Sequence, residues 1–174
     1  MNYFELFEMP VSLQVDKKYL QQKYFELQKK YHPDFFSNES EEEQADVLEK
    51  SSMINKAYKA FQNSDETIKY VLQLKGLLEE EEKYQLPPDF LMQMMELNEM
   101  LMDVDDSSVE ETETRISQLQ KYLYDKVQNI IEYYNEERTT DEQLLQVKDY
   151  YYKKKYLNRI LERLDGMRNI ASQK

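Results

Sequence analysis

The chain has 174 residues, with 35 acidic side chains, 23 basic ones and a net charge of −12. This balance argues against nucleic acid and anionic membranes as partners, because phosphate binding requires a basic surface. The absence of cysteine and the presence of a single histidine argue against disulfides and against metal sites built on thiolate or imidazole. We therefore expect no metal and no cofactor.

The chain begins without a basic leader or an apolar signal core, and no run of apolar residues is long enough to span a bilayer. These features predict a cytoplasmic protein. Only two glycines and four prolines interrupt the chain, and apolar residues recur at helical spacing. We therefore expect an all-α fold with two helical domains, 1–75 and 88–174. A linker is expected over residues 76–87, which contain a glycine, an acidic run and a proline pair.

The first domain is predicted to begin with a short amphipathic turn over residues 3–7. Asp16 predicts the start of a longer helix, because its carboxylate can accept hydrogen bonds from the free amides of the first turn. Pro33 disfavours helical geometry at His32, so we expect this helix to end there. Its apolar stripe consists of Leu20, Tyr24, Leu27 and Tyr31.

A second long helix is expected to run antiparallel to the first, after a loop over residues 35–39. Ser40 and Glu43 match a capping box at its start, and Asn63 interrupts the helical pattern at its end. A shorter helix follows, and Gly76 is placed to end it. The apolar positions of these two helices are Val47, Leu48, Ile54, Ala57, Tyr58, Phe61, Ile68, Val71, Leu72 and Leu74.

Three long helices are predicted in the second domain, and their spacing of apolar residues indicates an antiparallel three-helix bundle. The first runs over residues 88–104. The second begins near Ser107 or Ser108, and the third begins at Thr139 or Thr140, each with a capping partner. The second and third carry the apolar residues Ile116, Leu119, Leu123, Val127, Ile130, Tyr134, Val147, Tyr150, Leu157, Ile160, Leu164 and Met167.

The predicted helix over residues 88–104 has more apolar positions than one buried face requires. One stripe is enough to bury it in a bundle and consists of Phe90, Met94, Leu97, Leu101 and Val104. A second set lies off this stripe, among acidic residues, and consists of Leu91, Met92, Met95 and Met102. Because methionine suits an adaptable binding surface, this set indicates a second contact. The alternative is that a wide core or the first domain covers it.

The tripeptide His32-Pro33-Asp34 lies between two predicted helices, where it would form the tip of a hairpin. An ordinary loop is one interpretation, in which Asp34 only holds the turn through backbone hydrogen bonds. Catalysis with His32 as a general base is not supported, because no phosphate-binding loop, nucleophile elbow or cysteine accompanies it. We therefore do not expect an enzyme.

The tripeptide, the stripe that ends in Tyr31 and the sequence INKAY at 54–58 together resemble the J-domain, the DnaJ-type module that activates DnaK-type heat-shock ATPases. The sequences YFELF, LQKKYHPDFF, KYVLQLKG and FLMQMMEL extend the resemblance to the HscB-type co-chaperones of iron–sulfur cluster assembly. It covers essentially the whole chain and is loosest over residues 105–145. The chain departs from the usual J-domain pattern at Phe35, where many members have lysine, and at Ser64 and Thr67.

The resemblance implies a J-domain, with a helical hairpin, an HPD loop and short flanking helices, followed by a three-helix bundle. It also implies a co-chaperone that binds an iron–sulfur cluster scaffold protein, delivers it to a DnaK/HscA-type chaperone and stimulates the ATPase of that chaperone. A J-protein for another client, or a helical interaction protein without chaperone activity, are the alternatives.

The implied sites fall in two places. Residues 17–31 form a locally basic helix with five lysines and one acid, which suits an acidic chaperone surface. The residues implied for chaperone binding are His32, Pro33, Asp34, Lys23, Lys29 and Lys30. The residues implied for scaffold binding are Leu91, Met92, Met95, Glu96, Glu99, Asp103 and Tyr156.

Overall fold

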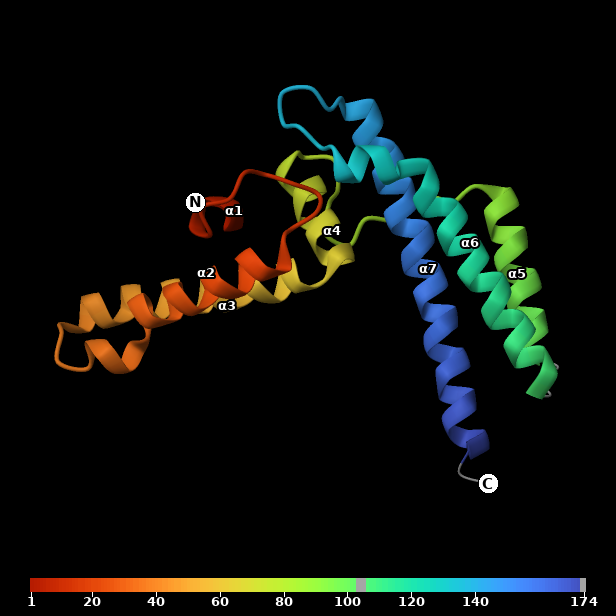
Figure 1. Cartoon of the computed structure of the whole chain (residues 1–174), viewed down its shortest axis with the longest axis horizontal. Coiled ribbons are helices and arrows are strands. Elements are labelled where there is room, and N and C mark those ends of the chain that lie inside the picture. The colour runs from red at the N-terminus through yellow and green to blue at the C-terminus, as the bar shows by residue number, and fades with distance from the viewer. Residues whose placement is uncertain (103–105, 173–174) are drawn as a thin grey trace. The chain divides into compact units, whose positions relative to one another are not determined.

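The computed structural model describes residues 1–102 and 106–172, and it contains no strand within those ranges. The predicted all-α fold is therefore confirmed. In chain order (Figure 1), the elements are α1 (Tyr3–Leu6), α2 (Lys17–Tyr31), the 3-10 turn η1 (Pro33–Phe36), α3 (Glu41–Gln62), α4 (Ser64–Leu74), α5 (Pro88–Met102), α6 (Asp106–Glu132) and α7 (Asp141–Ser172). Contacts divide the chain into two compact units, Met1–Lys75 with Tyr134–Arg138 and Gly76–Tyr133 with Thr139–Lys174.

In the first unit, α2 and α3 lie side by side as an antiparallel hairpin, with η1 at its far end (Figure 1). Tyr24 of α2 stacks on Tyr58 of α3, with ring centroids 3.8 Å apart and an interplanar angle of 12°. The Tyr24 hydroxyl donates to Asn55 Oδ1 at 2.9 Å, and the Gln28 amide donates to the same oxygen at 2.7 Å. Aromatic stacking and a shared acceptor therefore hold the middle of the hairpin together.

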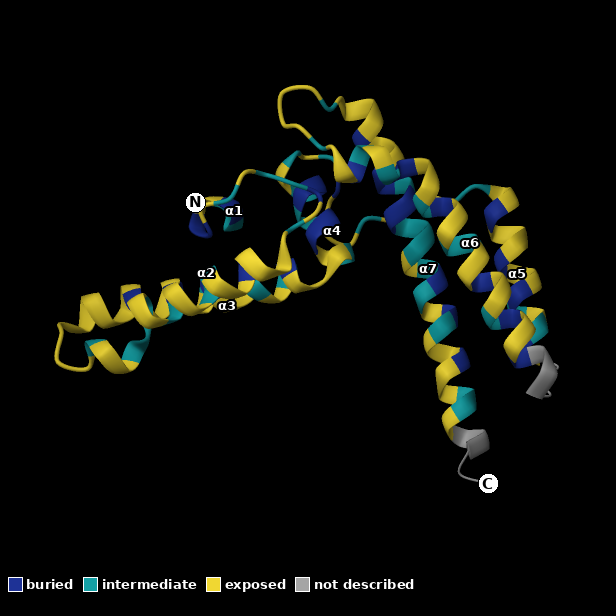
Figure 2. Ribbon diagram, viewed as in Figure 1, coloured by how far each residue is buried: buried dark blue, intermediate teal, exposed yellow. Residues whose placement is uncertain are grey.

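The core of the first unit lies where α1 and α4 pack against the end of α3. Phe61 is at its centre, fully buried, with the ring of Phe4 at 4.8 Å and that of Phe7 at 5.7 Å. The other buried apolar side chains are Leu6, Leu13, Leu20, Leu27, Val47, Ile54, Ala57, Ile68, Val71 and Leu72. The hairpin beyond this core is largely exposed (Figure 2).

Polar side chains cap the helices at the positions that the sequence predicts. Asp16 accepts from two first-turn amides of α2, and Ser40 accepts from a first-turn amide of α3. Thr140 caps α7 by accepting from the Gln143 amide at 3.1 Å, while the Gln143 side chain accepts from the Thr140 amide at 3.0 Å. Gly76 follows the end of α4 with φ +70°, a conformation that glycine adopts without strain.

Some burial predictions are wrong. Leu48 is 61% exposed, because it lies on the part of α3 beyond the core of the first unit. On α6, Ile131 is buried and Ile130 is only half-buried, since the apolar stripe continues from Val127 at a spacing of four. Tyr134 lies beyond the end of α6.

In the second unit, α6 and α7 pack along their length and α5 packs on both of them (Figure 1). This arrangement is the predicted antiparallel three-helix bundle. Its core is formed by Phe90, Met94, Leu97, Leu101, Val109, Ile116, Leu123, Val127, Ile131, Leu144, Val147, Tyr150, Tyr151, Leu157, Ile160 and Leu164. Within the described ranges, no helix combines the length and the apolar character needed to cross a membrane.

Residues 76–87, expected to be a linker, belong to the second unit and are anchored on α7. Leu78 is buried, and Glu82 Oε1 accepts from Lys148 Nζ at 2.7 Å. Tyr84 stacks on Tyr152, with ring centroids 4.5 Å apart. An ion pair and an aromatic pair therefore fix the path of this segment before α5 begins.

Candidate functional site

His32-Pro33-Asp34 lies at the free end of the α2–α3 hairpin. α2 ends at Tyr31, and His32 has φ −71° and ψ 128°, the extended conformation that a following proline favours. Pro33 then begins η1, and the Phe35 amide donates to the His32 carbonyl at 3.0 Å. Residues 35–36 therefore form part of a 3-10 turn, at the start of the segment predicted to be a loop. Because Pro33 both ends α2 and starts this turn, it holds the tripeptide in one conformation.

His32 and Asp34 present polar atoms to solvent, with side chains that are 45% and 86% exposed. The Asp34 amide donates to His32 Nδ1 at 3.3 Å, so the neutral imidazole carries its proton on Nε2. His32 Nδ1 also lies 3.5 Å from Asp34 Oδ2, which forms an ion pair when the ring is protonated. Both side chains are accessible to a partner.

The basic surface at this end of the hairpin comes from two helices. Lys29 and Lys30 are exposed at the end of α2, and Lys30 Nζ lies 5.3 Å from the centroid of the Tyr31 ring. Lys50 of α3 lies 4.8 Å from the same centroid. Sequence reasoning missed Lys50, because its position beside Tyr31 depends on how the two helices pair.

Lys23, which we expected on this surface, is engaged within the first unit. Its side chain is 14% exposed, forms an ion pair with Glu8 and lies 3.6 Å from Glu26. The hydrogen bond between Lys23 and Glu8 raises the pKa of the lysine and lowers the pKa of the carboxyl group. Lys17 is also engaged, because its Nζ donates to two carbonyls at the C-terminus of α3 at 2.7 and 2.8 Å. Lys23 therefore has partners within the first unit, and its role in chaperone binding stays a prediction.

The second candidate site is on α5, which has two apolar faces of which only one is buried (Figure 2). The buried face consists of Phe90, Met94, Leu97 and Leu101. Leu91 is 39% exposed, Met92 64%, Met95 63% and Met102 84%. At 3.6 residues per turn, Met92 lies opposite the buried face, and Met95 and Met102 lie on the flank turned away from it, so the core of the bundle does not take up this set. We call Leu91, Met92, Met95, Glu96, Glu99 and Met102 the outer face of α5.

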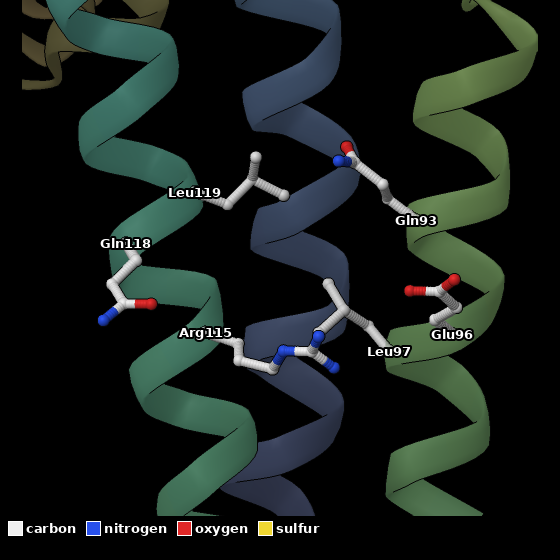
Figure 3. A pocket seen from close by; sticks show the side chains of 6 residues that line it. All are labelled: Gln93, Glu96, Leu97, Arg115, Gln118 and Leu119. Atoms are coloured by element: carbon white, nitrogen blue, oxygen red, sulfur yellow. The ribbon is translucent and has the colours of Figure 1, made fainter.

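Glu96 of the outer face also lines a shallow groove of about 270 Å³ between α5 and α6. The groove is lined by Gln93, Glu96, Leu97, Arg115, Gln118 and Leu119 (Figure 3). Arg115 Nη1 donates to Met100 Sδ at 3.2 Å, and within the described part of the chain no ion pair joins it to Glu96. The carboxylates of Glu96 and Glu99 are both exposed and available to a basic partner.

Tyr156 of α7 packs near the first turn of α5. Its ring meets that of Phe90 edge to face, with centroids 6.4 Å apart and an interplanar angle of 84°. Tyr156 and Leu91 line the same groove, so the structure brings these two predicted residues together. Asp103, which we expected in the same site, lies outside the described residues.

Among residues 1–102 and 106–172, no group of three or more histidine, aspartate or glutamate side chains could hold a metal ion. The two units have different architectures. The first is a helical hairpin with HPD at its free end and short helices at its base, and the second is a three-helix bundle. This combination defines the class: the chain is a J-domain protein with a C-terminal helical bundle.

Comparisons with known proteins identify the family. Residues 86–165 match the family model described as the HSCB C-terminal oligomerisation domain. The chain is 33% identical over 151 residues to the co-chaperone protein HscB homolog of Photobacterium profundum, covering 86% of this chain and 83% of the relative. It is 37% identical over 128 residues to the co-chaperone protein HscB of Buchnera aphidicola, covering 73% and 72%.

Solved structures agree. The crystal structure of human co-chaperone protein HscB superposes with a TM-score of 0.81 at 29% identity, covering 97% of this chain and 82% of that one. The chaperone HscB from Vibrio cholerae superposes with a TM-score of 0.76 at 25% identity, covering 97% and 98%. The chain belongs to the HscB co-chaperone family, and the resemblance seen in the sequence is confirmed.

Proposed function

We propose that this protein binds an iron–sulfur cluster scaffold protein, delivers it to a DnaK/HscA-type heat-shock chaperone and stimulates ATP hydrolysis by that chaperone. The observation that carries the proposal is the exposed His32-Pro33-Asp34 at the end of the α2–α3 hairpin. Family membership supports the co-chaperone role, and the outer face of α5 supports a second partner. In this proposal the protein acts in the cytoplasm and carries out no covalent step itself.

The end of the hairpin offers the chaperone two kinds of interaction, short-range polar contacts and longer-range electrostatic attraction. The Nε2–H of His32 and the carboxylate of Asp34 supply short-range polar contacts whose directions are fixed by η1. Lys29, Lys30 and Lys50 supply positive charge around them, which favours encounter with an acidic surface. The tripeptide stimulates hydrolysis if it binds the hydrolysis-competent state of the chaperone more tightly than the other states.

The outer face of α5 offers the scaffold protein an apolar surface with an acidic rim. Exposed methionine side chains adapt to the shape of a partner, and Glu96 and Glu99 favour a partner with basic residues beside its apolar patch. The scaffold protein holds the cluster, because this chain has no cysteine to ligate it.

The substitution His32→Gln tests the chaperone role. It removes the imidazole from a site without core contacts, so we expect the fold and scaffold binding to remain. Stimulation of a purified DnaK/HscA-type ATPase should fall about tenfold or more in a single-turnover assay, because the contact depends on a fixed geometry. Lys56→Gln, an exposed change elsewhere on α3, serves as the control and should leave stimulation unchanged.

Equal stimulation by wild type and His32→Gln would show that the J-domain role is wrong. Stimulation by a wild-type protein that does not bind the scaffold would indicate a J-protein for another client. If the wild-type protein stimulates no such ATPase, the remaining alternative is a helical interaction protein without chaperone activity.

A further inference from the structure

The second unit contains another groove, which shares only Leu91 with the outer face of α5. It has a volume of about 730 Å³ and lies between residues 82–88, the first turn of α5 and the middle of α7. Leu91 and Tyr156 line it, so the groove begins where the outer face of α5 ends. We call it the α7 groove.

The α7 groove is basic, although the chain as a whole has a net charge of −12. The cationic side chains in its lining are Lys83, Lys155 and Arg159, all of them exposed. Within the described residues, none of the three forms an ion pair. Glu82, the carboxylate in the lining, accepts from Lys148 at 2.7 Å and from the Tyr152 hydroxyl at 3.0 Å. Lys148 therefore compensates the negative charge of Glu82 and leaves three uncompensated cations.

The wall between these cations is apolar. Tyr84 and Tyr152 stack with an interplanar angle of 8°, and their hydroxyls are engaged with protein carboxylates, since they donate to Asp149 and Glu82. Both phenols are neutral at physiological pH, as an ordinary tyrosine is, and burial raises the pKa of Tyr84 to about 12 and raises that of Tyr152 as well. Leu86 and Leu91 add aliphatic surface beside the rings.

We propose that the α7 groove binds an acidic, apolar segment of the scaffold protein and thereby fixes the orientation in which that protein docks. This inference rests on the proposed function. The outer face of α5 presents Glu96 and Glu99, while the adjoining groove presents Lys155 and Arg159. A partner with the complementary order of charges is attracted to both, whereas the same partner docked in reverse meets like charges at each end.

Aromatic rings beside cations also bind single-stranded nucleic acid, and two observations favour a protein segment instead. The rings of Tyr84 and Tyr152 already stack on each other, which removes one face of each from base stacking. Glu96 and Glu99 on the adjoining surface would repel a phosphate backbone that continued past the groove.

A charge reversal within the full-length chain tests the inference. The double variant Lys155→Glu with Arg159→Glu should bind the purified scaffold protein about tenfold or more weakly in calorimetry at low salt. The difference should shrink at about 300 mM salt, where exposed charges are screened. Lys121→Glu with Lys126→Glu changes the net charge equally at exposed positions on α6 and should alter the affinity less than about threefold. Circular dichroism and ATPase stimulation without the scaffold should match wild type for both variants.

Three outcomes would overturn the inference while the proposed function stands. The first is unchanged scaffold binding by the groove variant. The second is an equal loss in both double variants, which would reflect net charge alone. The third is binding of a single-stranded RNA oligonucleotide that only the groove variant loses, with scaffold binding intact. A wild-type chain that does not bind the scaffold at all would instead overturn the proposed function and the groove together.

Discussion

The end of the α2–α3 hairpin and the outer face of α5 are both exposed, but they suit different kinds of binding. At the hairpin end, a proline and a 3-10 turn fix the directions of a few polar atoms. On α5, flexible methionine side chains spread apolar surface along a regular helix. Binding through a few fixed polar atoms depends on each of them, whereas apolar binding scales with area. We therefore expect a single change at the hairpin end to remove most of the stimulation, whereas each single change on α5 should remove only part of the scaffold binding.

The largest effect in this comparison is expected from the triple variant Met92→Ala, Met95→Ala and Glu96→Ala. Each change should cost about 1 kcal/mol of scaffold binding, and the triple should lower the affinity about 100-fold in calorimetry. The single variants should each lose about three- to tenfold, in contrast to His32→Gln at the hairpin. Stimulation of the ATPase in the absence of scaffold should be retained.

Met94→Ala provides the matched control on the buried face of the same helix. It leaves a cavity in the bundle and should lower the free energy of unfolding by about 2–5 kcal/mol. The triple variant should lose much less stability in denaturant unfolding. A loss of stability like that of Met94→Ala, with both activities falling together, would identify the outer face as part of a core.

A smaller effect is expected from Lys29→Ala with Lys30→Ala. Removing this charge should slow association with the chaperone about three- to tenfold at low salt and leave dissociation nearly unchanged, because exposed charges act mainly on encounter. Stopped-flow association kinetics at several salt concentrations measure this. The control Lys56→Ala with Lys59→Ala removes equal charge from exposed positions on α3. A change confined to dissociation would contradict the long-range role of these lysines.

The smallest effect concerns Tyr84, in the wall of the α7 groove. The pKa of its phenol is about 12 in the folded chain and near 10.0 in the unfolded chain. Above pH 10 the unfolded state therefore loses the phenolic proton before the folded state does. Stability from Tyr84 is therefore present below pH 10 and is lost as the pH rises towards 12. Tyr84→Phe should be less stable at neutral pH, because it lacks the hydrogen bond to Asp149, but its stability should fall less over this alkaline range. Denaturant unfolding at several pH values measures the difference. If the stabilities of wild type and Tyr84→Phe fall in parallel as the pH rises, Tyr84 does not cause this pH dependence.

The features that could be predicted from the sequence are local ones. Asp16 is predictable as a helix start, and Thr140 as one of two candidates, because a cap involves only residues two or three positions away. The two faces of α5 follow from helical periodicity alone, and the position of His32 follows from the proline after it.

The features that could not be predicted depend on pairing between distant segments. The engagement of Lys23 with Glu8 requires the chain after α1 to pack beside α2. The α7 groove requires Lys83 to meet Lys155, 72 positions further along the chain, on the same surface. Nothing in the sequence near either lysine indicates that meeting. The same limit explains why segment 76–87 was expected to be a linker, since its anchors lie on α7.

The outer methionines of α5 expose thioether sulfur to solvent, whereas Met94 on the same helix does not. Peroxide converts an accessible thioether into a polar sulfoxide, and methionine sulfoxide reductases restore it. Because the chain has no cysteine, oxidants that reach it act on its exposed methionines, most of which lie on this one helix face. Oxidative stress would therefore change the polarity of the α5 surface while the buried side of the same helix keeps its packing.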